Sequence, residues 1–461
     1  MMQTTVASCP RESITIAPIT TAAGTVQLPG SKSISNRALF MAAMAQGKTT
    51  LTGLLRADDT ERMLDALKTL GISVSFDNDT QVTVTGCGGR IPVKEGELFI
   101  GNAGTATRTL TALLAFAGGN YRIDGVARMR ERPIGDLLEA LRSLGAKITC
   151  EINEGFLPLT FEPAFCVGSR VSVRGNVSSQ YLTALLMLAP TIASEEGFWI
   201  DIKGELISRP YVEMTVRMMR DFGIEARETV TGFWVPRGTY RRRTPCRKRT
   251  SGFWVPRGTY CARASYRVEA DASAASYFLA LGALTGGPVT VTGVGKDSIQ
   301  GDVAFADALL QMGATVEKTN DSITVSRHAS HPLKGLSLDC TAIPDAAMTF
   351  VPMALMTEGP VHLTGIGSWR VKETDRLAAM ACEMRKFGAT IEEGSDYIVV
   401  ARPENGKLTD ATVDTYDDHR MAMSLALAAC AGITVTVNDP RCTAKTYPDY
   451  FEVFGQLAAE R

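Results

Sequence analysis

One pattern of hydrophobic and polar positions recurs along the chain. A stretch with helical periodicity ends in a hydrophobic residue and a glycine, and strand-like alternation follows. Glycine suits the position after a helix, because the left-handed conformation common there costs glycine little. Five copies carry this pattern: "MLDALKTLGISVSF", "LLEALRSLGAKITC", "VRMMRDFGIEARE", "ADALLQMGATVEK" and "AAMACEMRKFGATIEE". The sequence therefore predicts repeated units of helix and strand.

A second, more apolar helix precedes this pattern in each unit. It opens with small or polar residues and closes near a short strand. The six openings are "GSKSISNRALFMAAMAQG", "GNAGTATRTLTALLAFAGG", "GNVSSQYLTALLMLAP", "ADASAASYFLALGALTGG", "IPDAAMTFVPMALMTEG" and "DDHRMAMSLALAACAG". Each unit is predicted as β-α-β-α-β-β. Six such units indicate an α/β (α+β) fold of two domains with three units each.

One interval in the repeat is too long. The glycines of the five copies, at positions 71, 145, 223, 313 and 388, are separated by 74, 78, 90 and 75 residues. The long interval contains the segment "GFWVPRGTY" twice, at 232–240 and 252–260. We interpret residues 231–250 as a tandem insertion, because their removal leaves one copy. This stretch holds seven basic residues and no acidic one, so a nucleic-acid-binding patch stays open as the alternative.

Composition narrows the class of protein. The 461 residues are 45% hydrophobic, enough for two domains with their own cores. Basic and acidic residues balance at 48 and 49, and no apolar run reaches the length of a membrane span, so we expect neither a nucleic-acid nor a membrane partner. The N-terminus lacks the features of a signal peptide, which favours a cytoplasmic location. The ten cysteines are scattered singly, as is typical of reduced thiols, and His328 and His331 lack a third metal ligand nearby.

Charged residues gather at the openings of the apolar helices. The start of a helix binds anions through its free N–H groups and dipole, although ordinary N-capping also explains polar residues there. Cations at or near these turns and at related loops are Lys32, Arg37, Arg108, Arg132, Arg370, Lys372, Arg376, Arg420 and Lys445. They indicate small substrates with several phosphate and carboxylate charges. Asp271, Asp345 and Glu373 are candidates for proton transfer or for ion pairing.

Eight motifs carry a family resemblance: "LPGSKSISNRAL", "GNAGTATR", "RMRERPIGDL", "SSQYLTALLM", "IPDAAMT", "WRVKETDRLAAM", "YDDHRMAM" and "CTAKTYPDYF". From about Ile14 to Ala459 the chain resembles the 5-enolpyruvylshikimate-3-phosphate synthase family. The resemblance implies a transferase of the shikimate pathway, which makes chorismate for aromatic amino acid biosynthesis. It moves the enolpyruvyl group of phosphoenolpyruvate to the 5-hydroxyl of shikimate 3-phosphate and releases phosphate by addition and elimination. No metal or organic cofactor takes part.

The resemblance also implies domains, an oligomeric state and site residues. One domain holds 1–30 with 269–461, the other holds 31–268, and the protein is a monomer. Shikimate 3-phosphate is expected at Lys32, Ser33, Arg37, Ser178, Ser179, Gln180, Ser208, Asp345, Ser368 and Lys372. Phosphoenolpyruvate is expected at Lys32, Gly104, Arg132, Gln180, Arg376, Arg420 and Lys445. Asp345 is the implied base for the attacking hydroxyl, Glu373 the proton donor to the methylene carbon, and Lys32 the donor to the leaving oxygen.

The chain departs from the family pattern at three side chains. Ser368 stands where the family has Asn, and Thr107 and Thr109 stand where it has Met and Pro. Because Pro suits the first turn of a helix, its loss at 109 is expected to let Gly104 and Thr105 shift. The hypothesis is a site that discriminates against the inhibitor glyphosate. The nearest alternative is the related enolpyruvyl transferase acting on UDP-N-acetylglucosamine, against which the pair Lys32 and Ser33 and the "SSQ" triplet argue.

Overall fold

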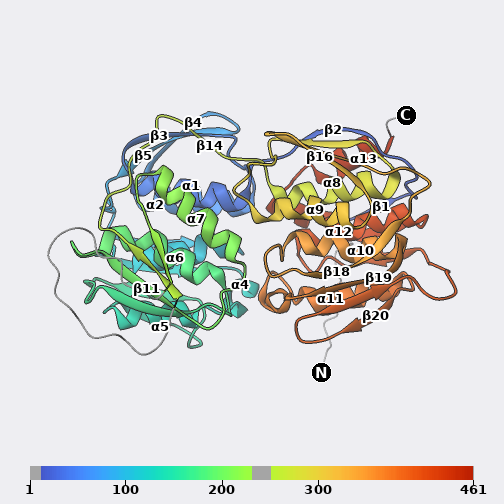
Figure 1. The fold of residues 1–461 in the computed structure, drawn as a ribbon. Helices are drawn as coiled ribbons and strands as arrows, with labels where there is room; N and C mark the ends of the chain where they lie inside the picture. Colours follow the sequence, from blue (N-terminus) through green and yellow to red (C-terminus); the bar gives the residue numbers. More distant parts are fainter. Residues whose placement is uncertain (1–11, 231–250, 460–461) are drawn as a thin grey trace, which may run out of the picture. The chain divides into compact units, whose positions relative to one another are not determined.

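The computed structural model describes residues 12–230 and 251–459, which fall into two compact units. The first unit takes the residues up to Pro29 and those from Glu269 on, and the second unit is Gly30–Val268. These boundaries lie within one residue of those the resemblance implies. Figure 1 shows helices and sheets in both units.

The second unit holds three four-stranded sheets among the described residues. Their strands are β14 (Tyr266–Arg267), β3 (Gln46–Thr52), β5 (Gln81–Cys87) and β4 (Ser73–Asn78); β6 (Glu95–Phe99), β7 (Asn120–Asp124), β9 (Leu159–Glu162) and β8 (Lys147–Cys150); and β10 (Arg170–Arg174), β11 (Phe198–Lys203), β13 (Ser251–Val255) and β12 (Arg227–Val230). Its helices are α1 (Lys32–Met44), α2 (Asp58–Thr69), α3 (Gly104–Leu114), α4 (Ala127–Glu131), α5 (Gly135–Ser143), α6 (Ser179–Ile192) and α7 (Arg209–Asp221).

The first unit holds one three-stranded and two four-stranded sheets in the part of the chain that is described. Their strands are β1 (Ser13–Ile16), β23 (Val435–Asn438) and β22 (Ala411–Val413); β16 (Thr315–Lys318), β17 (Ser322–Ser326), β15 (Val289–Thr292) and β2 (Gly24–Gln27); and β18 (Leu333–Asp339), β19 (Thr357–Thr364), β21 (Ile398–Ala401) and β20 (Thr390–Glu393). Its α-helices are α8 (Ala272–Thr285), α9 (Ala304–Gln311), α10 (Phe350–Met353), α11 (Arg376–Lys386), α12 (His419–Leu425) and α13 (Tyr450–Ala459). Its 3-10 helices are η1 (Gly301–Val303), η2 (Ala346–Thr349), η3 (Ala354–Met356), η4 (Gly367–Val371), η5 (Ala426–Ala431) and η6 (Pro440–Lys445).

The four-stranded sheets share one topology. In the sheet of β6 to β9, the β6/β7 pair is parallel, and the β7/β9 and β8/β9 pairs are antiparallel. Two sheets take their parallel outer strand from a distant segment, because β2 pairs with β15 and β14 pairs with β3. The predicted α/β fold of six repeats is confirmed, and segments next to the chain crossings complete the first repeat of each unit.

The second copy of the duplicated segment forms part of a sheet. Its first four residues make up most of β13, the inner strand between β11 and β12, with Trp254 opposite both Trp199 and Arg227. Tyr260, the last residue of this copy, is buried, and its hydroxyl donates to the carbonyl of Met187 at 3.0 Å. The first copy and the basic run, residues 231–250, lie outside the described residues. Their interpretation as an insertion or as a nucleic-acid patch therefore stays a prediction.

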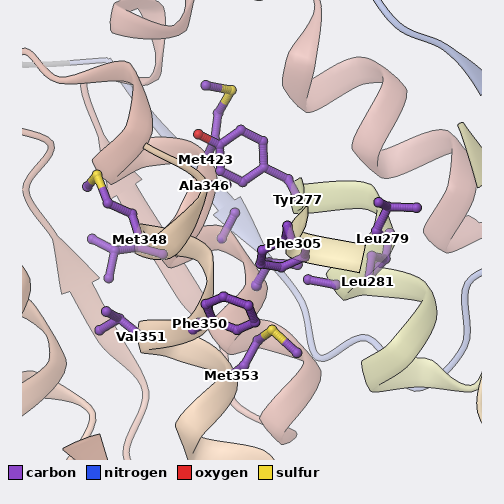
Figure 2. Packing of buried hydrophobic residues seen from close by; sticks show 14 of the residues in the cluster. Tyr277, Leu279, Leu281, Phe305, Ala346, Met348, Phe350, Val351, Met353 and Met423 are labelled. Carbon is purple, nitrogen blue, oxygen red and sulfur yellow. The ribbon is translucent and has the colours of Figure 1, made fainter. Parts of the chain in front are cut away.

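The more apolar helix of each repeat lies in the core. In α8 every residue from Ala272 to Leu284 is buried, in α3 every residue is buried, and α1 and α6 are almost as fully enclosed. Figure 2 shows the packing in the first unit, where the rings of Phe305 and Phe350 stack with centroids 4.4 Å apart. Such close packing fixes the positions of the helix ends. The polar openings of these helices are thus held by a rigid interior.

Candidate active site

Arg376 is the centre of a buried charge cluster in the first unit. It is the first residue of α11, which Asp375 caps by accepting from the N–H of Ala378. Its guanidinium, with 1% of the side chain exposed, lies 3.0 Å from Asp345 Oδ1, 2.9 Å from Glu373 Oε2 and 2.7 Å from Asp418 Oδ2. Burial by itself lowers the pKa of Arg376, but the charges of the three carboxylates outweigh burial and raise it. Arg376 is therefore a permanent cation.

Three more cations contact the same carboxylates. Lys372 Nζ is 3.5 Å from Asp345 Oδ1, and Arg420 Nη2 is 3.1 Å from Asp345 Oδ2. Lys445 Nζ is 3.4 Å from Glu373 Oε1. We call the seven residues the carboxylate–cation cluster: Asp345, Lys372, Glu373, Arg376, Asp418, Arg420 and Lys445. Six of them were predicted from the motifs, and the structure brings all six together.

Several short elements position the cluster. The indole of Trp369 in η4 donates to the carbonyl of Pro344 at 2.6 Å, which ties η4 to the segment of Asp345. Asp418 caps α12 by accepting from the N–H of Arg420 at 2.9 Å. Tyr416, Asp417 and Asp439, which precede α12 and η6, have left-handed backbones although none is glycine. Such strained residues cluster at functional sites, where surrounding contacts hold them.

Two predicted cations of the second unit have different partners. Lys32, at the start of α1, lies 3.6 Å from the buried carboxylate of Asp59. Arg37 donates to neutral oxygens, namely Thr215 Oγ1 at 2.8 Å, the carbonyl of Ser33 at 2.9 Å, the carbonyl of Tyr211 at 3.3 Å and Thr183 Oγ1 at 3.4 Å. Burial lowers the pKa of Arg37 to about 10. Its positive charge therefore has no acidic partner among the described residues.

Gly104 and Arg132 meet at the start of α3. A Cβ atom at Gly104 would lie 2.7 Å from Arg132 Nη2, so only glycine lets the guanidinium approach this closely. Arg132 Nη1 also donates to the carbonyl and to the side-chain oxygen of Asn102, both at 3.1 Å. Ala103, which precedes the helix, offers no side-chain cap. The cation thus lies against a helix start that favours anions.

The predicted serines lie at helix openings. Ser178 caps α6 by accepting from the N–H of Gln180 at 3.2 Å, and Ser179 is the first residue of that helix. Ser208, with φ of 52°, precedes α7 in a left-handed conformation. Ser368 lies half-buried in η4 of the first unit. Ordinary N-capping is thus confirmed for several openings and does not by itself identify a site.

Three expectations need correction or extension. Asp271 is the N-cap of α8 and accepts from the N–H of Ala274 at 3.0 Å, which is a structural role. Arg370 pairs with Asp375 at 2.9 Å and donates to the carbonyl of Gly394, and neither partner belongs to the carboxylate–cation cluster. The placing of Thr109 in a first helical turn is wrong, because α3 begins at Gly104 and Thr109 is its sixth residue.

Two buried carboxylates were missed by sequence reasoning. Asp418 contacts Arg376, and Asp59 contacts Lys32. For Asp418 the signal was its place in "YDDHR", two residues before Arg420. For Asp59 the sequence offers no comparable signal, since the contact with Lys32 forms only in the tertiary structure.

The described residues contain neither a candidate metal centre nor a candidate membrane helix. No group of three or more His, Cys, Asp or Glu residues within 12–230 and 251–459 is arranged to hold a metal ion. No helix in these ranges has the length and hydropathy to cross a bilayer. The eight cysteines they contain are free thiols.

Comparison with known proteins gives one consistent result. The family model of EPSP synthase (3-phosphoshikimate 1-carboxyvinyltransferase) matches residues 16–454. A curated 3-phosphoshikimate 1-carboxyvinyltransferase of Burkholderia lata is 53% identical over 449 residues, covering 96% of this chain and 98% of that protein. The one of Paraburkholderia phytofirmans is 51% identical over 453 residues, covering 97% and 99%. A solved EPSP synthase structure from Acinetobacter baumannii shares the fold, with a TM-score of 0.74 at 24% identity over 96% of this chain and 97% of that one.

The fold and the cluster define an α/β enzyme of six repeats that acts on small anionic substrates. The chain belongs to the EPSP synthase (3-phosphoshikimate 1-carboxyvinyltransferase) family. Its function is that of the family, a transferase reaction of the shikimate pathway of aromatic amino acid biosynthesis.

Proposed function

We propose that the carboxylate–cation cluster is the acid–base centre of carboxyvinyl transfer from phosphoenolpyruvate to the 5-hydroxyl of shikimate 3-phosphate. The observation that supports this is the sharing of Arg376 by Asp345 and Glu373, at 3.0 and 2.9 Å. A carboxylate among several cations is an ionised acceptor, which is the form a general base needs. An anionic substrate that takes over these guanidinium contacts frees the carboxylates to move protons.

The addition step uses two carboxylates. The 5-hydroxyl oxygen bonds to the central carbon of phosphoenolpyruvate, and Asp345 takes the hydroxyl proton. Glu373, protonated once phosphoenolpyruvate has taken over the contacts of Arg376 and Lys445, gives that proton to the methylene carbon, which becomes the methyl group of a tetrahedral adduct. In the elimination, the bond to the phosphate oxygen breaks while Lys32 protonates that oxygen, and a methyl proton returns to Glu373. At the end of the cycle Asp345 releases the proton that it took and Lys32 regains the one that it gave, both by exchange with solvent, so the protons balance. The proposed mechanism uses side chains of this chain and solvent, and it includes no metal or organic cofactor.

Further residues are assigned to substrate binding together with those of the cluster, and the cations among them hold the substrate charges. Phosphoenolpyruvate is assigned to Lys32, Gly104, Arg132, Gln180, Arg376, Arg420 and Lys445. Shikimate 3-phosphate is assigned to Lys32, Ser33, Arg37, Ser178, Ser179, Gln180, Ser208, Asp345, Ser368 and Lys372. Preorganised cations stabilise the charge that develops in the transition state, and in many enzymes this stabilisation contributes most of the rate enhancement. The near balance of 48 basic and 49 acidic residues fits free small-molecule substrates, and we infer a cytoplasmic monomer without nucleic-acid or membrane partners.

We also retain the hypothesis that the chain discriminates against glyphosate, on a corrected structural basis. The hydroxyl of Thr109 donates to the carbonyl of Thr105 at 3.0 Å and of Ala106 at 3.2 Å. A proline at this sixth position of α3 has no N–H to donate and crowds the carbonyl of Thr105. Threonine therefore supports a straighter start of the helix next to Gly104 than proline would.

Phosphate release by the purified chain tests the proposed reaction. We expect release only when shikimate 3-phosphate and phosphoenolpyruvate are both present, and none when either is supplied alone. A fourth arm replaces shikimate 3-phosphate with UDP-N-acetylglucosamine in the presence of phosphoenolpyruvate. Release in that arm alone would favour the related transferase, and release with phosphoenolpyruvate alone would contradict a transfer reaction.

A further inference from the structure

Helix α11 holds the segment 414–420 at two points. At its start, Arg376 donates to both side-chain oxygens of Asp418, at 2.7 and 3.3 Å. Seven residues later, about two helical turns on and on the same face, Glu383 contacts the same segment near its beginning. The motifs explain the first contact, and nothing in the reaction described so far uses the second.

The carboxylate of Glu383 is fully buried and its contacts are specific. Oε2 accepts from the backbone N–H of Asp414 at 2.9 Å and lies 2.6 Å from Lys386 Nζ. Oε1 accepts from the hydroxyl of Tyr416 at 2.7 Å. A buried charge is costly unless it is paired and hydrogen-bonded, and both oxygens here have partners. Two of the three partners belong to the turn between β22 and α12.

That turn adopts a conformation its residues do not favour. Tyr416 and Asp417 have φ of 55° and 54°, in the left-handed region that side chains disfavour. Such a backbone persists only where surrounding contacts determine it. The next residues are Asp418, which contacts Arg376, and Arg420, whose Nη2 lies 3.1 Å from Asp345. The turn therefore sets where α12 presents these two side chains.

We propose that Glu383 is a positioning residue for the transfer reaction, holding the left-handed turn so that Arg420 meets Asp345. It touches no substrate and acts through Arg420. The proposal rests on the proposed role of Arg420 in binding phosphoenolpyruvate. Removal of a hydrogen bond to the Glu383 carboxylate should therefore displace Arg420 and weaken the binding of phosphoenolpyruvate.

Steady-state kinetics of Tyr416→Phe and Glu383→Gln test the proposal. We expect the KM for phosphoenolpyruvate to rise about tenfold, the size of one charge-assisted hydrogen bond, while the KM for shikimate 3-phosphate stays within about twofold. The matched control is Tyr397→Phe. Tyr397 donates to Glu392 at 2.9 Å in an exposed tyrosine–glutamate pair of the same unit, so its kinetics should be unchanged. The proposal is overturned if the kinetics of Tyr416→Phe and Glu383→Gln match those of this control, or if both KM values rise equally.

A double-mutant cycle with Arg420→Lys separates positioning from general stability. If Glu383 acts through Arg420, Glu383→Gln adds little to the loss in kcat/KM that Arg420→Lys already causes. Additive losses contradict this. If Arg420→Lys leaves the KM for phosphoenolpyruvate unchanged, the proposed role of Arg420 falls, and the positioning proposal falls with it. Should Glu383→Gln fail to fold, Tyr416→Phe, which keeps the carboxylate, decides the question in the same cycle.

Discussion

Two buried arginines, one in each unit, have their positive charge compensated by different kinds of partner. Arg376 in α11 and Arg37 in α1 are 1% and 2% exposed. The partners of Arg376 are three carboxylates, whereas those of Arg37 are two threonine hydroxyls and two carbonyls. The pKa of Arg376 is raised by its acidic partners, and the pKa of Arg37 is lowered to about 10 by burial.

The difference teaches that the partners of a buried cation, rather than its burial, decide what it can do. The charge of Arg376 is compensated within the first unit, so its geometry is set before substrate arrives and its acids are placed to move protons. The charge of Arg37 is compensated only by dipoles among the described residues. Binding of an anion then supplies the missing charge, which suits a binding role.

The largest expected effect comes from removing one of the carboxylates that compensate the positive charge of Arg376. Asp418→Asn removes one charge from a fully buried pair while keeping a good N-cap for α12. The free energy of unfolding should fall by about 3 kcal/mol, because breaking a buried ion pair leaves an under-compensated charge. Urea unfolding followed by circular dichroism measures this change.

A matched control for this change is Asp375→Asn. Asp375 pairs with Arg370 at 2.9 Å on the surface of the same unit and also caps a helix. Its loss should cost less than about 1 kcal/mol, as is usual for exposed pairs. Equal effects of the two variants would mean that burial of the Arg376 pair adds nothing.

The next effect concerns the neutral partners of Arg37. Thr215→Val keeps the shape of the side chain but removes the hydroxyl that accepts from Arg37 Nε at 2.8 Å. We expect the free energy of unfolding to fall by about 1–3 kcal/mol, since a buried charged donor loses its acceptor, and the KM for shikimate 3-phosphate to rise.

Thr111→Val is the control in the same unit. The hydroxyl of Thr111 is buried in α3 without a hydrogen-bond partner among the described residues, so its removal should be neutral or stabilising. A destabilisation as large as that of Thr215→Val would show that the hydroxyl bonded to Arg37 has no special importance.

The smallest effect tests the helix that lies beside Arg132. Thr109→Pro removes the N–H of residue 109 and displaces the start of α3, so inhibition by glyphosate should become about tenfold tighter. The inhibition constant, measured against phosphoenolpyruvate, reports this change. Thr109→Ser, which keeps the hydroxyl and the N–H, should leave it unchanged. A constant that Thr109→Pro does not alter would remove the hypothesis.

Local rules allowed much of the fold to be predicted. The five glycines of the repeat, at 71, 145, 223, 313 and 388, all have positive φ, as expected for residues that follow a helix. The position of Thr109 within its helix was misjudged, because α3 starts at Gly104 and Thr109 lies past its first turn. The partners Asp59, Asp418 and Glu383 were missed because each contacts a residue distant in sequence. Their carboxylates become significant only when the fold brings them to Lys32, Arg376 and the turn at Tyr416.

The most direct test of the central claim is the turnover of Asp345→Asn. If Asp345 is the general base of the carboxylate–cation cluster, kcat should fall by about two to four orders of magnitude while shikimate 3-phosphate still binds, as measured by calorimetry. A kcat near that of the unaltered chain would contradict the assignment of proton transfer to Asp345.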